Sequence, residues 1–211
     1  MAYLQRICFG LLVALGASVA NGIETPEYTV IKTYPDFELR QYKPHLIAEV
    51  EVMATFEDAG SAAFGVLAAY IFGENQSESK MKMTAPVQQE SREKIAMTAP
   101  VSQQSVADDP DEKKRYRVNF FMPSKYTMET LPRPNNPAVK IREVPARTLA
   151  VRRYRGSWST KRYRKEEAAL LEALKRESLK PVGMPIFNRY NSPFSLPVMR
   201  TNEVAIETQN D

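Results

Sequence analysis

A five-residue sequence, Met-Thr-Ala-Pro-Val, occurs twice within one short stretch of this chain. The copies span Met83–Val87 and Met97–Val101, and both lie inside the segment Lys80–Val101. Apolar and polar residues alternate ahead of each proline, which is the two-residue period of a β-strand. Proline has no N–H to donate, so each strand must end, bulge or lie at a sheet edge there. A polar spacer separates the copies, so the segment predicts a β-hairpin that is structural rather than catalytic.

The first twenty residues differ in character from the rest of the chain. A cationic start containing Arg6 precedes an apolar run at Ile7–Val19, and Ala20 completes a small-x-small site. This order is typical of a secretory signal peptide over residues 1–20, cleaved after Ala20. A short membrane anchor is the alternative, but about thirteen apolar residues are too few to span a bilayer comfortably. We therefore expect an exported protein, in the periplasm or outside the cell, without a stable membrane span after signal cleavage.

Cysteine usage and charge exclude several classes of function. The single cysteine is Cys8, so the chain from Asn21 onward has no thiol for a disulfide, thiolate catalysis or a metal–thiolate site. The 29 Lys and Arg residues against 25 Asp and Glu make the protein only mildly basic. Because the aromatic residues fall at core-like spacing instead of beside a basic cluster, we expect no nucleic-acid binding.

The remaining pattern alternates strands with two helices. Strands are predicted at Tyr28–Tyr42 (bent or split), His45–Val52, Tyr116–Met122, Val139–Val144, Thr148–Arg155, Ile186–Tyr190 and Glu203–Glu207. Helices are predicted from a cap at Thr55 through Phe72, and from a cap within Ser157–Thr160 through Glu177. Each half has the order strand, strand, helix, strand, strand, which predicts one domain over residues 21–211 with two pseudo-repeats at about 24–106 and 114–207. The fold class is α+β, with antiparallel strands joined into a barrel-like core.

Several spaced segments, taken in order, resemble the SOUL haem-binding protein family. They are Arg40-Gln41-Tyr42, the doubled K-I-A-M-T-A-P-V sequence, Phe120–Tyr126 followed by E-T-L-P, and Tyr190–Pro193 with Arg200–Val204. The resemblance covers roughly residues 24–207. It implies a tandem-repeat, distorted antiparallel β-barrel flanked by two helices, which agrees with the order of elements above. It also implies haem or a related tetrapyrrole as a ligand that is not covalently attached.

The same resemblance places the ligand in an apolar groove between the first helix and the loop that joins the last two strands. Carried over to this chain, the helix wall comprises Phe64, Leu67, Ala68 and Ile71. The loop Asn191–Pro197 forms the other wall, chiefly through Phe194 and Leu196. Arg200 and Lys80 are the cations that we expect to face the propionates.

Iron ligation depends on which side chain could reach the metal. Some family members have a histidine between the Arg and Tyr of the Arg-x-Tyr element, whereas this chain has Gln41 there. The only histidine, His45, is therefore the candidate metal ligand. Alternative ligands are a thioether from Met81, Met83 or Met97, or the phenol of Tyr70. We predict mainly apolar binding without a strong axial ligand.

The sequence thus predicts an exported protein that carries or buffers haem or a related tetrapyrrole. One alternative is a module that binds another amphipathic small molecule or a protein partner through the same groove. A hydrolase on the same fold is a further alternative, with carboxylate chemistry from Glu49, Glu51 or Glu203, which strand alternation places on solvated faces. With one histidine and no evident Ser–His–acid set, we do not expect an enzyme.

Overall fold

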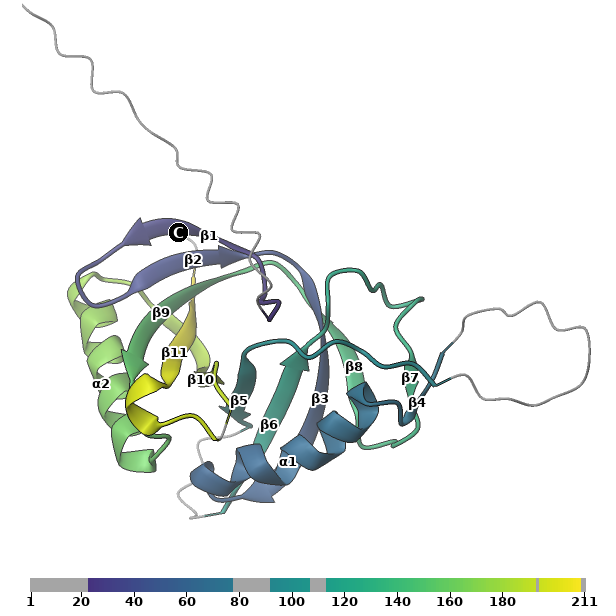
Figure 1. The fold of residues 1–211 in the computed structure, drawn as a ribbon. Coiled ribbons are helices and arrows are strands. Elements are labelled where there is room, and N and C mark those ends of the chain that lie inside the picture. The colour runs from purple at the N-terminus through teal and green to yellow at the C-terminus, as the bar shows by residue number, and fades with distance from the viewer. Residues whose placement is uncertain (1–22, 78–91, 107–112, 193, 210–211) are drawn as a thin grey trace, which may run out of the picture.

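The curved sheet that dominates the protein is seen in a computed structural model, which describes residues 23–77, 92–106, 113–192 and 194–209 (Figure 1). Within these residues nine strands form one sheet of antiparallel neighbours in the order β1-β2-β9-β11-β10-β5-β6-β3-β8. Their bounds are β1 Tyr28–Thr33, β2 Glu38–Tyr42, β3 His45–Ala54, β5 Val101–Ser105, β6 Lys114–Phe121, β8 Lys140–Val144, β9 Arg147–Arg155, β10 Pro181–Arg189 and β11 Thr201–Thr208. Two short strands, β4 (Asn75–Gln76) and β7 (Arg133–Pro134), pair separately.

Both helices begin where capping side chains predict. The helix α1 (Phe56–Ile71) starts after Thr55, whose Oγ1 accepts a hydrogen bond from the Asp58 N–H at 3.2 Å. The helix α2 (Thr160–Arg176) starts after Ser159, whose Oγ accepts from the Arg162 N–H at 3.3 Å. Such caps satisfy N–H groups that the first helical turn leaves unpaired. None of the helices in the described ranges has the length and apolar character needed to cross a bilayer.

The two helices pack on one face of the sheet and leave the other face open. The helix α1 covers β3, β5 and β6, whereas α2 covers β9, β10 and β11. The apolar core lies between these helices and the sheet, because alternate strand residues such as Ala48, Val50 and Val118 point toward them. In Figure 1 the opposite face is the inside of the curve, which β1 and β2 cover from above.

The order of strands in the sheet is symmetric. The elements β2-β3-α1-β5-β6 recur along the chain as β8-β9-α2-β10-β11. If each strand is replaced by its counterpart in the other repeat, the sheet order from β2 to β8 becomes the same order read from the opposite edge. The predicted α+β class and the predicted order of elements are therefore confirmed. The barrel is not closed, because β1 and β8 are edges with a partner on one side only.

The segment ahead of the second pentapeptide copy is not the strand that the hairpin prediction requires. The first copy, Met83–Val87, lies outside the described residues. Residues 92–97 ahead of the second proline are not a strand, and β5 begins only at Val101. Instead this segment is tied to the end of α1: the Ile95 N–H donates to the Ile71 carbonyl at 2.8 Å. The Asn75 amide also donates to the Glu93 carbonyl at 2.8 Å. The backbone of this segment therefore forms hydrogen bonds with the end of α1 and with the Asn75 side chain, and not with a neighbouring strand as the sequence pattern predicts.

Candidate functional site

The predicted helix wall consists mostly of core residues. Leu67, Ala68 and Ile71 are 0%, 7% and 1% exposed, because they face the sheet. Phe64 is half-buried and meets the Phe120 ring of β6 edge-on, with ring centroids 5.6 Å apart. Of the four residues, Phe64 is therefore the one that reaches the surface, and the other three hold the helix in place.

The predicted loop wall is fully presented to solvent. In the β10–β11 loop (residues 190–200), Phe194 is 95% exposed and Leu196 is 64% exposed. Val198 and Met199, in the short 3-10 helix η1 (Pro197–Met199), are also exposed. Large apolar side chains gathered on a surface mark interaction sites, because burying them is favourable. The exposed apolar surface of the loop therefore extends beyond the two residues that the sequence indicated.

Two arginines and the only tryptophan of the chain lie at the base of this loop. The Arg200 guanidinium carbon is 4.1 Å from the Trp158 ring centroid, and that of Arg189 is 5.0 Å from it. Arg189 is 7% exposed, its Nη2 donates to Gln103 Oε1 at 2.8 Å, and its Nε has no hydrogen-bond partner. Burial lowers the pKa of Arg189 to about 10, and the nearby Arg200 charge contributes to the same decrease. The loop base is thus electropositive.

A glycine of α1 brings the helix and the loop together. A Cβ atom at Gly60 would lie 2.0 Å from Arg189 Nη1, closer than any side chain tolerates. Because Arg189 ends β10, this contact places α1 directly beside the start of the β10–β11 loop. Sequence reasoning identified Arg200 but missed Arg189 and Trp158, which carry no recognisable local motif.

His45 lies away from this region, on the open face of the sheet. It lines a cavity of ≈ 260 Å³ whose walls come from β1, β2, β3, β5, β6, β8, β9 and β10. Its Nδ1 is 2.8 Å from the Lys43 carbonyl oxygen, so in the neutral ring Nδ1 carries the proton. Burial lowers the pKa of His45, and the charges of Arg147 and Arg142 lower it further. The helix α1 packs on the other face of β3, and of the described residues of the β10–β11 loop only Tyr190 lines the same cavity as His45.

A buried ion-pair cluster joins two segments that carried the family resemblance. Glu203 is 0% exposed, and its Oε1 accepts hydrogen bonds from Arg40 Nη1 and Arg153 Nε, each at 3.0 Å. The Tyr190 hydroxyl donates to Glu203 Oε2 at 2.6 Å. Burial lowers the pKa of Arg40, but Glu203 and Tyr42 raise it by more, so the net shift is upward. The expectation that Glu203 is solvated is wrong, because β11 is a central strand beneath the β1–β2 cover.

The other carboxylates considered for catalysis are also engaged. Glu49 pairs with Arg142 at 3.0 Å, and Glu51 pairs with Arg117 at 3.0 Å. Among the described residues no group of three or more His, Cys, Asp or Glu side chains is placed to hold a metal ion.

The fold and these sites define an α+β domain with a helix-backed, open antiparallel sheet. The chain belongs to the SOUL haem-binding protein family, since the model described as "SOUL heme-binding protein" matches residues 23–91 and 88–207. It is similar to "Heme-binding protein 2" of Homo sapiens, with 26% identity over 201 residues, 92% of this chain and 90% of that protein.

Solved structures share the fold at much lower identity. The C-terminal domain of EcmrR has a TM-score of 0.61 and 8% identity, covering 87% of this chain and 99% of that one. A hydrolase from Listeria innocua has a TM-score of 0.54 and 10% identity, covering 85% of this chain and 94% of that one. Similarity at this level concerns the architecture alone.

Proposed function

We propose that this protein binds haem or a related tetrapyrrole without covalent attachment, and carries or buffers it. Family membership and the name of the human relative support this ligand class. The observation that carries the proposal is the position of Arg200, stacked on Trp158 at the base of a loop whose Phe194 and Leu196 are exposed. Haem presents an apolar ring and, at one edge, two anionic propionates, so it needs an apolar surface next to a cation.

The proposed binding mode is mainly apolar. Covering exposed apolar side chains with a flat ring gains about 25 cal/mol per Å² before association costs. Phe194, Leu196 and Phe64 form the apolar contacts, Arg200 takes a propionate, and the buried Arg189 adds positive potential. No strong axial ligand is proposed, because His45 lies on the other face of the sheet. Tyr70 is also unsuited, since it is 1% exposed and its hydroxyl donates to the Pro132 carbonyl at 2.7 Å.

Titration of haemin into a chain that starts at Asn21 tests this proposal. We expect a Soret shift at micromolar protein, and about a tenfold weaker affinity in Arg200→Gln, because a charge-assisted hydrogen bond is worth about 1.5–3 kcal/mol. Arg155→Gln is the matched control, since Arg155 is an exposed arginine at the end of β9. An absent Soret shift, or equal losses in both variants, would overturn the proposal.

The position of the ligand has a separate test. Because His45 lies on the opposite face of the sheet, His45→Ala should leave the haem spectrum unchanged. A lost or shifted Soret band in this variant would instead place the iron in the cavity.

Export is part of the same proposal and rests on the sequence of residues 1–20. Expression with the native N-terminus in a secreting host, followed by N-terminal sequencing, should give a mature chain that begins at Asn21. A chain that retains Met1 and stays with the membrane fraction would favour an anchor instead.

The exposed loop also favours a second candidate function. Phe194, Leu196, Val198 and Met199 would serve another amphipathic ligand or a protein partner equally well. Native mass spectrometry of the purified protein would separate this candidate from the first by the mass of any bound molecule. A hydrolase is less well supported, since Glu49, Glu51 and Glu203 all form ion pairs.

A further inference from the structure

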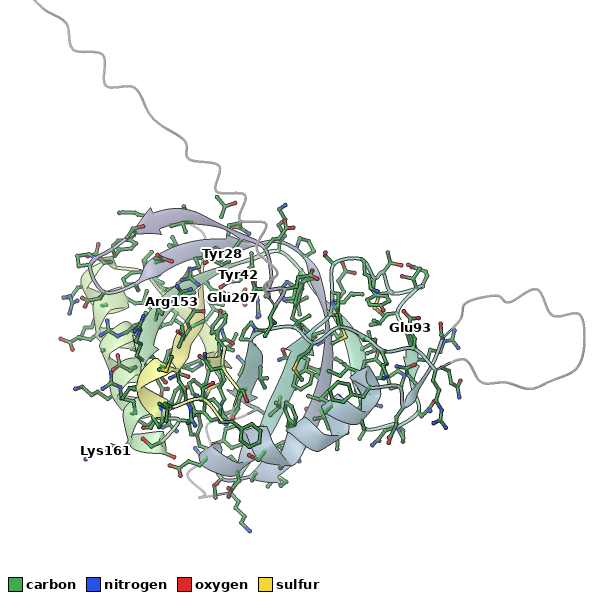
Figure 2. The ribbon with its side chains drawn as sticks, viewed as in Figure 1. Tyr28, Tyr42, Glu93, Arg153, Lys161 and Glu207 are labelled. Carbon is green, nitrogen blue, oxygen red and sulfur yellow. The ribbon has the colours of Figure 1, made fainter. Side chains whose placement is uncertain are left out.

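The cavity on the open face of the sheet collects arginines from several strands. Cross-strand partners share one face of a sheet, so the pairings Ile47–Arg142 and Tyr42–Arg147 place both arginines on the face opposite the helices. The cavity lining contains four arginines: Arg117, Arg142, Arg147 and Arg153. Figure 2 labels Arg153, Tyr28 and Tyr42, which all line this cavity. This face therefore combines arginine side chains with aromatic walls.

Three of the four arginines are matched by carboxylates. The pairs are Arg117–Glu51, Arg142–Glu49 and Arg153–Glu203, each with a nitrogen–oxygen distance of 3.0 Å. Such pairs cancel charge and occupy the donors that face the carboxylates. Among the described residues, Arg147 is thus the one arginine of this lining that forms no ion pair.

Arg147 is also incompletely hydrogen-bonded. Its Nε is buried and has no hydrogen-bond partner. Burial lowers the pKa of Arg147; Glu207 raises it without forming an ion pair, and Arg142 lowers it. An arginine nevertheless stays protonated at neutral pH. Arg147 as a whole is half-buried, and its Nε is buried without a partner, so an anion that binds this guanidinium supplies the missing acceptor and counter-charge.

The rest of the lining defines the body of the ligand. Tyr28, Tyr42, Phe121, Leu149, Ile186 and Tyr190 supply apolar surface. The volume of ≈ 260 Å³ is just below the range of about 300–1,000 Å³ that drug-sized ligands occupy, and it is too small for a tetrapyrrole. Glu49 also lines the cavity and Glu207 lies close to Arg147, so a singly charged anion suits the site better than a dianion.

We propose that this cavity is a second binding site, which takes a small amphipathic carboxylate. The carboxylate binds the Arg147 guanidinium, whose planar fork of N–H donors matches the two carboxylate oxygens. The apolar body of the ligand lies against Tyr42 and Leu149. The site is separate from the proposed haem contacts, because Phe64, Arg189 and Arg200 do not line this cavity.

Calorimetric titration of octanoate into the chain from Asn21 tests this site. We expect saturable one-to-one binding that Arg147→Gln weakens at least tenfold and that Arg147→Lys weakens less. Arg155→Gln is again the matched control, because it removes the same charge from the same strand outside the cavity lining. Octylammonium, which has the same chain and the opposite charge, should not bind.

Four results would overturn the proposal: no octanoate binding at millimolar concentration, equal binding of octylammonium, tighter binding of octyl phosphate, or unchanged affinity in Arg147→Gln. Circular dichroism shows whether each variant is folded, and if Arg147→Gln is not, Leu149→Asn tests the apolar wall in its place. Haemin titration in saturating octanoate should give the same Soret response as without it. The haem proposal and the cavity proposal therefore fail separately.

Discussion

Two glycines of α1 should respond in opposite directions to the same substitution. Gly65→Ala meets no atom within 4 Å, so it should stabilise the protein by about 1 kcal/mol through helix propensity alone. Gly60→Ala places its Cβ 2.0 Å from Arg189 Nη1 and 2.9 Å from its Cζ. Arg189 is 7% exposed and bonded to Gln103, so its guanidinium cannot simply move into solvent.

The net effect at Gly60 follows from three contributions. The propensity gain of about 1 kcal/mol opposes an overpacking cost of about 1–3 kcal/mol and a lost charged hydrogen bond of about 1.5–3 kcal/mol. We expect a net loss of about 1.5–5 kcal/mol in the free energy of unfolding, measured by urea titration. Trp158 is the only tryptophan, so its fluorescence also reports displacement of Arg189 directly. Unchanged emission together with stability at or above that of the wild type would refute the close contact at Gly60.

Three further predictions concern stability. Glu203→Gln should cost about 3 kcal/mol or more in urea titration, because it leaves Arg40 buried without its main counter-charge; equal stability would contradict this. Thr55→Ala should cost about 1 kcal/mol, since the cap of α1 is lost; helix content at equal temperature gives a second readout. The pKa of His45 is lowered on folding, so the unfolded chain binds more protons below about pH 6.5 and stability falls as the pH decreases there. His45→Leu should reduce that slope, and an identical pH profile would speak against a buried neutral ring.

Local signals in the sequence located the helices well. Thr55 and Ser159 each cap a helix through their own side chains, and such bonds depend only on residues three positions away. Strand alternation located β3 and β9 to within two residues for the same reason. The strand predicted ahead of the second pentapeptide copy is absent because Ile95 and Glu93 bond instead to Ile71, the last residue of α1, and to Asn75 of β4.

Long-range pairing accounts for what the sequence left out. Arg40 and Glu203 are 163 residues apart, so no local pattern shows that the two charges meet. Hydrophobic periodicity also does not show which strands lie at the edges of the sheet. For this reason the sequence predicts a barrel where the structure has an open sheet. The cavity arginines did leave a signal: Arg147, Leu149, Val151 and Arg153 alternate along one strand, so they share a face. Only the pairing of strands across the sheet shows that this face lines a cavity.

The symmetric sheet order has a consequence for how the chain can be divided. The strand β2 pairs with β9, and β8 pairs with β3, so each half lends an outer strand to the other half. The two halves of this single polypeptide are therefore arranged like the two subunits of a strand-exchanged dimer. A chain cut between β6 and β8 should yield fragments that stay unfolded apart and regain the native circular dichroism spectrum when mixed. Neither half can loosen without removing a strand from its neighbour, so the two candidate binding surfaces rest on a single cooperative unit.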